Sequence, residues 1–272
     1  MAEESRAFVP GHVTGFFSVH RADDPARTGS RGAGVTLADG VTTTVAPADE
    51  TSVTLNGDRT SVEAVERVLA HLDVTARVRC ETPLPAGAGF GVSGAAALGT
   101  ALAAADALAL ARTENDLVRV AHVAEVESGS GLGDVVAQAR GGVPVRLDPG
   151  APPHGRLDGL PAAGRVEYVS FGELSTASVI EGDVADLSAA GERALATLRD
   201  RPTTDHLVHL SRTFAREADL VADDVGAVLD EVPGAAMAML GRTAFAFGTA
   251  LSDAGYDATA TAVHPGGAAL RE

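Results

Sequence analysis

The sequence predicts an α+β protein, in which strands and helices are mixed without strict βαβ alternation. Runs rich in β-branched residues, several bounded by Gly, Asn or Asp, read as short strands. Apolar residues elsewhere recur at helical spacing, as they do from Val62 to Leu72. A Pro- and Gly-rich stretch at 148–163 is the expected linker, so we expect one domain over residues 1–155 and a second over 156–272.

The first half of the chain predicts strands wherever β-branched residues cluster, at 6–9, 34–37, 41–45, 51–55, 75–82 and 142–147. Pro10-Gly11 would end the first strand, and Asp39-Gly40 predicts a tight hairpin between the second and the third. Helices are expected at 61–72, 93–111 and 114–127, and another opens at Asp134. Thr113 is the expected N-cap of the helix at 114–127.

The second half predicts a mixture of the same kind. A strand at 165–171 comes first, followed by helices at 184–198, 204–221 and 225–232. Further strands are expected at 235–240, 244–248 and 258–263, with a helix or turn at 252–255. We find no internal repeat.

A glycine-rich segment at 85–97, P-A-G-A-G-F-G-V-S-G-A-A-A, follows a predicted strand and opens an Ala- and Leu-rich helix. Free N–H groups at a helix start and the positive end of the helix dipole attract anions. Glycine also lets the backbone approach phosphate oxygens without a Cβ in the way. We therefore expect a phosphorylated ligand here, and a tight strand-to-helix connection is the structural alternative.

This segment differs from two familiar phosphate-binding motifs. A Walker P-loop requires a lysine, and the chain has none, since all 21 of its Lys+Arg residues are arginine. A dinucleotide-binding fingerprint requires an acidic residue that closes a βαβ unit. Asp106 comes too early for that role and lies inside the predicted helix.

A second segment at 123–142, V-A-E-V-E-S-G-S-G-L-G-D-V-V-A-Q-A-R-G-G, ends a helix that carries Glu125 and Glu127. A glycine-rich turn follows, and Asp134 opens the next helix. Taken singly, Asp134 could be an N-cap and the glutamates a solvated helix end. With the glycine-rich loop they match the needs of phosphoryl transfer: cradled phosphates, oxygen ligands for Mg²⁺ and a carboxylate beside the accepting hydroxyl.

Composition restricts the partners. The net charge of −16 argues against nucleic acid and anionic membranes, because both require a basic patch. An acidic, lysine-free chain favours a salt-adapted protein of a halophilic archaeon, although a GC-rich genome would also replace Lys by Arg. Cys80 is the single cysteine, so no disulfide framework is expected. The acidic N-terminus lacks an apolar signal-peptide core, which predicts a cytoplasmic protein.

The chain resembles the GHMP kinases, the small-molecule kinases related to galactokinase, homoserine kinase and mevalonate kinase. Residues 85–96 are similar to their P-x-x-x-G-[LF]-x-x-S-x-A motif, and 129–134 with Gly141-Gly142 to their second, acidic segment. Residues 234–248 fall where the family has its third motif. The resemblance implies a two-domain α+β fold, with an N-terminal mixed-sheet ATP-binding domain and a C-terminal ferredoxin-like α/β sandwich.

The resemblance also implies ATP and Mg²⁺ as cofactors. Ser93 and Glu125 would hold Mg²⁺ and the nucleotide phosphates, and Asp134 would accept or orient the hydroxyl proton. The residues implied at the nucleotide are Pro85, Gly87, Gly89, Phe90, Gly91, Ser93 and Gly94. Val92 stands where a second Ser is frequent in the family. This difference argues against a sugar or mevalonate kinase more than it argues against phosphoryl transfer. Family members are often dimers, so a homodimer is implied.

Three segments narrow the resemblance to the archaeal pantoate kinases, which phosphorylate the 4-hydroxyl of pantoate on the route to coenzyme A. They are 8–17 (F-V-P-G-H-V-T-G-F-F), 29–35 (G-S-R-G-A-G-V) and Met239-Leu240-Gly241. The first includes His12 in a region where typical family members carry a lysine. Other small-molecule kinases, for homoserine or shikimate, and a non-catalytic metabolite sensor of the same fold are the alternatives.

Pantoate is a carboxylate, so its binding requires a positive group. Arg146 is the first candidate because a guanidinium holds a carboxylate through two parallel hydrogen bonds, and an ordinary strand-edge arginine is the alternative. Arg31 and His12 come next, and Ser30 could hydrogen-bond substrate or phosphate. The gem-dimethyl group requires an apolar wall, for which the candidates are Val13, Phe16 and Phe17.

Overall fold

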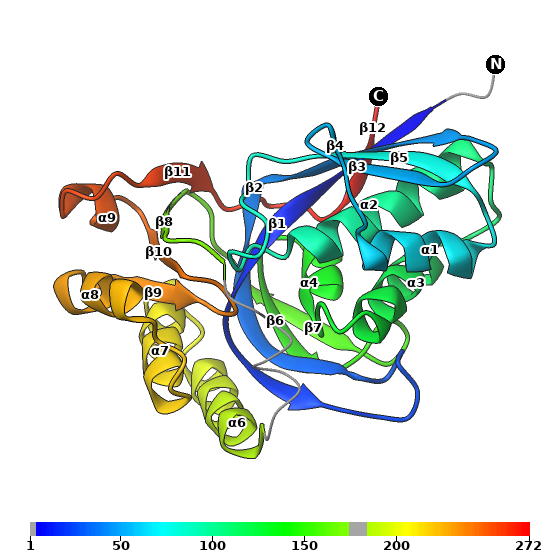
Figure 1. Ribbon diagram of the computed structural model, residues 1–272. Coiled ribbons are helices and arrows are strands. Elements are labelled where there is room, and N and C mark those ends of the chain that lie inside the picture. Colours follow the sequence, from blue (N-terminus) through cyan, green and yellow to red (C-terminus); the bar gives the residue numbers. More distant parts are fainter. Residues whose placement is uncertain (1–3, 174–183) are drawn as a thin grey trace.

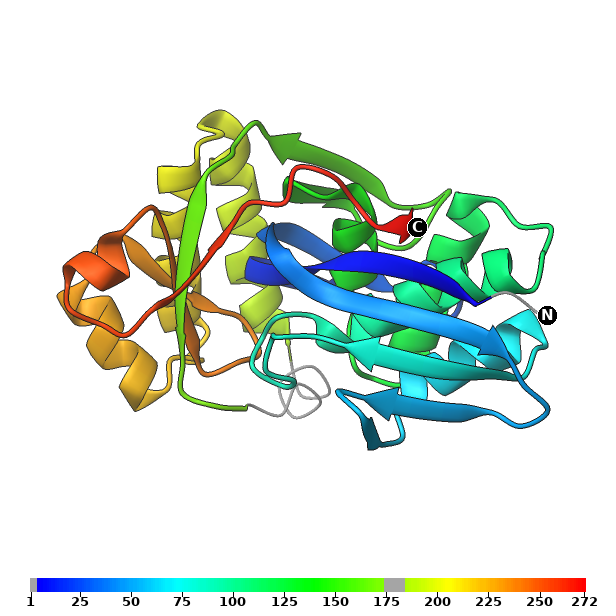
Figure 2. The same ribbon diagram turned by 90° about the horizontal axis from the view of Figure 1, so that it is seen from above.

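The computed structural model describes residues 4–173 and 184–272, whose strands form two sheets with helices packed against them (Figure 1). The first sheet is mixed and has eight strands, and the second has four. The predicted α+β class is therefore confirmed. Figure 2 shows the C-terminal segment crossing from the second sheet back to the first, where the last strand pairs with the first strand.

Two long antiparallel strands form the backbone of the first sheet: β1 (Ser5–His20) and β2 (Gly29–Pro47). The hairpin predicted at Asp39-Gly40 is wrong, because β2 runs through this dipeptide without turning. A register shift lets the pairing continue: Gly40 pairs with Pro10, whereas Leu37 pairs with the next residue of β1.

The sequence predicts that Pro10-Gly11 ends the first strand, but β1 continues through it. The register shift explains why. Proline is tolerated in a sheet at a bulge, where the ladder is already interrupted. The role of Gly40 is close approach, since a Cβ there would lie 2.2 Å from the carbonyl oxygen of Val9. A dipeptide typical of turns is used here to bring two strands together.

The other strands of the first sheet are shorter. They are β3 (Ser52–Leu55), β4 (Asp58–Arg59), β5 (Ala76–Glu81), β6 (Val143–Asp148), β7 (Arg156–Leu160) and β12 (Ala269–Arg271). The main order is β12-β1-β2-β5-β3-β4, with β6 paired to β2 and to β7. Strand β7 lies inside the predicted linker at 148–163, so part of that stretch belongs to the first sheet. The domain division at residues 155 and 156 stays a prediction.

Four helices accompany the first sheet: α1 (Glu63–Leu72), α2 (Val92–Ala107), α3 (Glu114–Glu127) and α4 (Asp134–Arg140). Helix α2 packs on β1 and β2, while α1 and α3 pack on α2, which buries its Ala-rich surface. The prediction for α3 is confirmed, and Thr113 caps it in a capping box with Asp116. Helix α2 ends before residue 111, because Ala109 adopts a left-handed backbone conformation with φ 50°.

The second sheet has the strand order β11-β8-β10-β9, with all neighbours antiparallel. Its elements are β8 (Arg165–Ser170), α6 (Ala185–Asp200), α7 (Thr204–Glu217), α8 (Asp223–Glu231), β9 (Ala235–Ala238), β10 (Thr243–Phe247), α9 (Ala250–Asp253) and β11 (Thr259–Ala262). Numbered within this half, the order is 4-1-3-2, which confirms the expected ferredoxin-like sandwich.

The two halves meet along β1. Helices α6 and α7 pack against this strand, and the backbone N–H of Met239 donates to the carbonyl of Thr14. The approach of α6 is close enough to require a glycine, because a Cβ on Gly191 would lie 2.0 Å from the carbonyl oxygen of Phe17. Backbone contacts of this kind allow little adjustment, so the halves are held in one arrangement.

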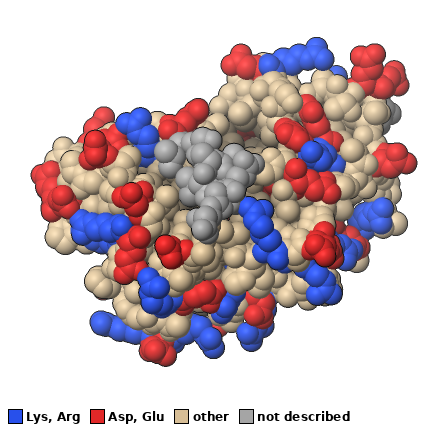
Figure 3. Space-filling view, turned by 60° about the horizontal axis from the view of Figure 1, so that its bottom comes forward, with Lys and Arg blue, Asp and Glu red and all other residues tan. Residues whose placement is uncertain are grey.

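The surface carries both signs of charge. Figure 3 shows acidic side chains spread over one face, with arginines between them. Many of the ion pairs are exposed, such as Arg193 with Glu217 at 2.7 Å, and pairs of this kind add little stability. Within residues 4–173 and 184–272, no helix has the length and apolar character needed to cross a bilayer.

Replacing Gly191 with Ala is expected to destabilise the protein by about 1–3 kcal/mol, because the new methyl group would separate α6 from β1. Gly226→Ala in α8 is the matched control, since both changes raise helix propensity but the nearest atom to its Cβ, on Val221, is 3.4 Å away. The control should stabilise by up to about 1 kcal/mol. Urea denaturation measures both, and equal shifts for the two variants would contradict the close packing.

Candidate active site

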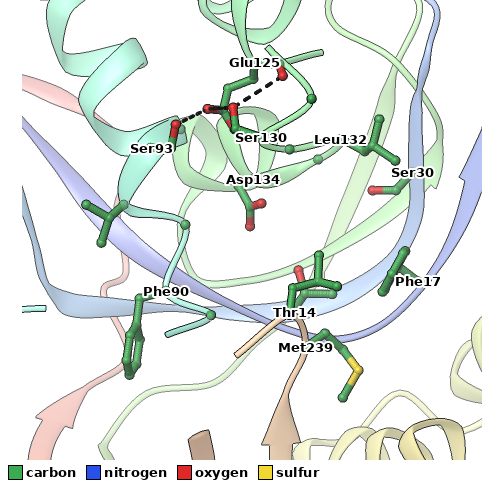
Figure 4. Close-up of a pocket in the computed structure, with 18 of the residues that line it drawn as sticks. Thr14, Phe17, Ser30, Phe90, Ser93, Glu125, Ser130, Leu132, Asp134 and Met239 are labelled. Carbon is green, nitrogen blue, oxygen red and sulfur yellow. Dashed lines mark hydrogen bonds between the residues drawn. The ribbon is translucent and has the colours of Figure 1, made fainter. Parts of the chain in front are cut away.

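A cavity of about 390 Å³ lies where the glycine-rich loop, the turn before α4 and the β9–β10 connection meet. Figure 4 shows Ser93, Glu125 and Ser130 on one side of it, Thr14 and Met239 on the opposite side, and Asp134 between them. Both glycine-rich segments predicted from the sequence therefore line one cavity.

The glycine-rich loop ends at Gly91, which has φ 63° and is the N-cap of α2. The loop is held from the second sheet, because the Thr243 hydroxyl donates to the carbonyl of Ala88 at 2.8 Å. Gly241 lies against the same peptide, where a Cβ would be 2.0 Å from the Ala88 oxygen. This contact explains the glycine in Met239-Leu240-Gly241, and it leaves the start of α2 directed at the cavity as an anion site.

Glu125 is 3% exposed and lies at the cavity wall. Its Oε1 accepts hydrogen bonds from the Ser93 hydroxyl at 2.6 Å and from the Ser130 hydroxyl at 2.7 Å. Burial raises the pKa of Glu125 to about 7, although both hydroxyls oppose the rise. The carboxyl group therefore holds its proton to a much higher pH than an exposed glutamate does.

Asp134 begins α4 and lines the cavity beside the turn 129–133. Its Oδ1 is 2.6 Å from Nδ1 of His12, whose side chain is fully buried. Burial acts to raise the pKa of Asp134, but the His12 hydrogen bond and the charge of Arg146 outweigh it and hold the pKa below its usual value. Asp134 is therefore the ionised carboxylate of the site, whereas Glu125 is partly protonated.

Arg146, on β6, lines the cavity although the residue is only 1% exposed. Its Nε and Nη1 have no hydrogen-bond partner among the described residues. Burial lowers the pKa of Arg146 to about 10, opposed by the charge of Asp134, so the group stays cationic at neutral pH. Unpaired, buried N–H donors of a cation are costly, which makes them a ready site for an anion.

Most residues predicted for the site line this cavity. They are Ser30, Gly87, Gly89, Phe90, Gly91, Ser93, Gly94, Glu125, Asp134 and Arg146. Pro85 precedes the lining and is exposed. Of the three apolar candidates, Phe17 lines the cavity, whereas Val13 and Phe16 are fully buried in the core.

Two predicted substrate residues lie outside the lining. Arg31 donates from Nε to the carbonyl of Leu147 at 2.7 Å and from Nη1 to Glu192 at 2.5 Å. His12 is behind Asp134, and its backbone N–H donates to the carbonyl of Phe90 at 2.9 Å. Arg31 thus connects the first sheet to α6, while His12 connects the base candidate to the glycine-rich loop.

Sequence reasoning missed several residues of the site. Ser130, Leu132, Thr14 and Met239 line the cavity. Gln138 is fully buried beside it and donates from Nε2 to the carbonyl of Gly91 at 2.8 Å. Two signals were present: Ser130 interrupts a run of glycines, and Gln138 follows Asp134 by four positions, which places both on one helix face.

The donor set fits Mg²⁺. A hard cation of this kind binds one or two carboxylates and completes its shell with phosphate oxygens and water. Glu125 with Ser93 supplies buried oxygen ligands, and the turn at Gly131 keeps the approach narrow, since a Cβ there would lie 2.3 Å from Glu125 Oε2. Among the described residues, no group of three or more His, Cys, Asp or Glu could hold a metal ion alone.

The chain is similar to known small-molecule kinases. A profile of the GHMP kinases N terminal domain matches residues 59–142. A pantoate kinase of Methanocaldococcus jannaschii is 32% identical over 248 residues, 88% of this chain and 90% of that protein. A pantoate kinase of Thermococcus kodakarensis is 35% identical over 261 residues, 89% of this chain and 86% of that protein. The chain belongs to the GHMP kinase family.

The solved structures agree with this membership. One described as a phosphotransferase related to the CoA biosynthesis pathway superposes with a TM-score of 0.86 and 30% sequence identity, over 99% of both chains. The predicted resemblance to GHMP kinases, and among them to archaeal pantoate kinases, is confirmed. The cavity is accordingly the candidate active site of a GHMP kinase.

Replacing Glu125 with Gln is expected to stabilise the ligand-free GHMP kinase at pH 8 and to change little at pH 4.5. Glu125 has a pKa of about 7 in the folded protein against an ordinary value of 4.5, so the folded state holds the proton more tightly. Its contribution is therefore present below pH 4.5 and is lost as pH rises through about 7, at a cost of about 3 kcal/mol.

Denaturant unfolding of the ligand-free protein at several pH values and constant salt measures this difference. Glu127→Gln is the control, because Glu127 lies on the same helix but is exposed and pairs with His71 on the surface. A difference between Glu125→Gln and the original protein that does not change with pH would contradict the prediction.

Proposed function

We propose that this GHMP kinase transfers the γ-phosphoryl group of ATP to the 4-hydroxyl of pantoate, with Mg²⁺, in coenzyme A biosynthesis. The observation that carries the proposal is the buried guanidinium of Arg146: two of its donors have no partner among the described residues, and the residue lines the same cavity as the glycine-rich loop and Asp134. The names of the pantoate kinase relatives support the same substrate. We propose a cytoplasmic location as well, and the homodimer stays a prediction.

The cavity suits the three parts of pantoate. Its carboxylate would pair with the guanidinium of Arg146, and Ser30 lines the same cavity. Its gem-dimethyl group would contact the apolar side chains of Phe17, Leu132 and Met239, which lie around Ser30 and Thr14 in Figure 4. Its 4-hydroxyl would then face Asp134.

The transfer requires little covalent chemistry from the protein. The start of α2 and the glycine-rich loop would hold the phosphates through backbone N–H groups. Glu125 and Ser93 would hold Mg²⁺, which neutralises phosphate charge when bound. Asp134 would accept the hydroxyl proton as the pantoate oxygen bonds to the γ-phosphorus and the bond between that phosphorus and the β–γ bridging oxygen breaks, which releases ADP.

The other acceptors fit less well. Homoserine carries an ammonium group, so its binding site would require a further carboxylate in addition to the catalytic base. The carboxylates among the described cavity residues are Glu125 and Asp134, which the proposal assigns to Mg²⁺ and to the hydroxyl proton, so neither is left for that purpose. A metabolite sensor that does not catalyse transfer would not require Asp134 as a base or Ser93 with Glu125 as metal ligands beside the glycine-rich loop.

The deciding experiment measures ADP release in molar KCl, which suits the salt adaptation predicted from composition, with pantoate, homoserine, shikimate and mevalonate. We expect pantoate-dependent release with the phosphate on the 4-hydroxyl, located by NMR. Asp134→Asn should lower kcat by about 10²–10⁴-fold while ATP still binds, because only proton acceptance is lost. Release with another acceptor, or ATP binding without turnover, would overturn the substrate or the activity respectively.

Arg146→Gln is expected to raise the KM for pantoate by about 10–100-fold and to leave the KM for ATP unchanged, because charge-assisted hydrogen bonds to the carboxylate are lost. Arg31→Gln is the matched comparison, since Arg31 is paired outside the cavity. Steady-state kinetics of both variants separates the two candidates. A larger rise in the pantoate KM for the Arg31 variant would assign the carboxylate to that residue instead.

A further inference from the structure

We propose that His12 is the positioning residue of Asp134, a role that rests on the proposed function. Its Nδ1–H holds Oδ1 of Asp134, so that Oδ2 is the oxygen left to take the substrate proton. His12 is then part of the base rather than a group that contacts pantoate. The sequence could not assign this role, because the two residues are 122 positions apart.

The placement of His12 argues against substrate contact. Its side chain is fully buried and does not line the cavity, whereas that of Asp134 is 23% exposed and does. The 2.6 Å between His12 Nδ1 and Asp134 Oδ1 makes this a short hydrogen bond to a charged acceptor. Because a carboxylate is only an acceptor, the proton of this bond belongs to His12, which defines the Nδ1–H tautomer.

The other ring nitrogen supports a neutral imidazole. Nε2 is buried and has no hydrogen-bond partner among the described residues. The ring fits because residue 34 is a glycine, since a Cβ on Gly34 would lie 2.4 Å from Nε2. Asp134 and Arg146 are the charged groups that act on the ring. Burial, the largest effect, lowers the pKa of His12 although Asp134 opposes it, and Arg146 lowers it further. The ring is therefore a neutral donor that adds no second cation beside Arg146.

His12 also connects the base to the phosphate loop. Its backbone N–H donates to the carbonyl of Phe90 at 2.9 Å, one residue before the N-cap of α2. Helix α4 makes a second connection, because Gln138 donates to the carbonyl of Gly91 at 2.8 Å. Asp134 is thus held to the loop through its own helix and through His12, which fixes the distance between the proton acceptor and the bound phosphate.

The test compares two amides at position 12. The amide of Asn reaches the position of the imidazole Nδ1, whereas the longer Gln reaches that of Nε2. We expect His12→Asn to keep kcat within about tenfold of the original value and His12→Gln to lower it by about a hundredfold, with both KM values unchanged. Thermal melting of both variants checks that they fold.

Two kinetic outcomes would overturn the proposal. Equal kcat values for the two variants would show that the Nδ1 donor has no special role. A rise in the pantoate KM at unchanged kcat would return His12 to direct substrate binding.

A readout without activity separates this proposal from the proposed function. In ¹⁵N-histidine-labelled protein, NMR should show His12 protonated at Nδ1 and unprotonated at Nε2, with its N–H proton signal shifted downfield and moved back in Asp134→Asn. The opposite tautomer, or a signal unaffected by Asp134→Asn, would overturn the His12 role in an active or an inactive protein. No turnover with any acceptor would overturn the proposed function alone.

Discussion

The site depends on keeping three ionisable groups at the wall of one small cavity in the protein interior. Glu125, Asp134 and Arg146 are each removed from water, and a buried charge without partners is costly. The protein partners the two acids with neutral donors, the hydroxyls of Ser93 and Ser130 and the ring of His12. Two nitrogens of the Arg146 guanidinium, Nε and Nη1, have no acceptor within the described residues.

The two carboxylates have different hydrogen-bond partners, and this gives them different pKa values. Glu125 accepts only from hydroxyls, and burial dominates, so its pKa rises to about 7. Asp134 accepts from an imidazole and feels the charge of Arg146, so its pKa falls. Two acids in one cavity thus differ in ionisation because their neighbours differ, which is how one site can hold a metal ligand and a proton acceptor together.

Local signals predicted the elements better than they predicted the pairings. The capping residue and length of α3, and the glycine-rich start of α2, follow from neighbours in sequence and were confirmed. The hairpin predicted at Asp39-Gly40 was wrong because Gly40 allows β1 to pack closely against β2. A contact between distant segments cannot be predicted from a local sequence pattern.

For the site, the sequence named Asp134 and Arg146 but could not say which side of β2 faces the cavity. Ser30 and Arg31 are adjacent in a strand, so their side chains point to opposite faces. Ser30 lines the cavity while Arg31 pairs with Glu192 on α6.

The absence of lysine from this chain bears on the same site. A lysine buried as deeply as Arg146 would lose much of its charge, because its pKa falls readily on desolvation. Arginine starts from a higher value and, even lowered to about 10, stays protonated at neutral pH. It therefore supplies a permanent cation with two unpartnered donors at the wall of a cavity whose other charged lining residues are Glu125 and Asp134. An anionic ligand that pairs with the Arg146 guanidinium would reduce the cost of burying this charge, so substrate recognition and stabilisation of the site would arise from one interaction.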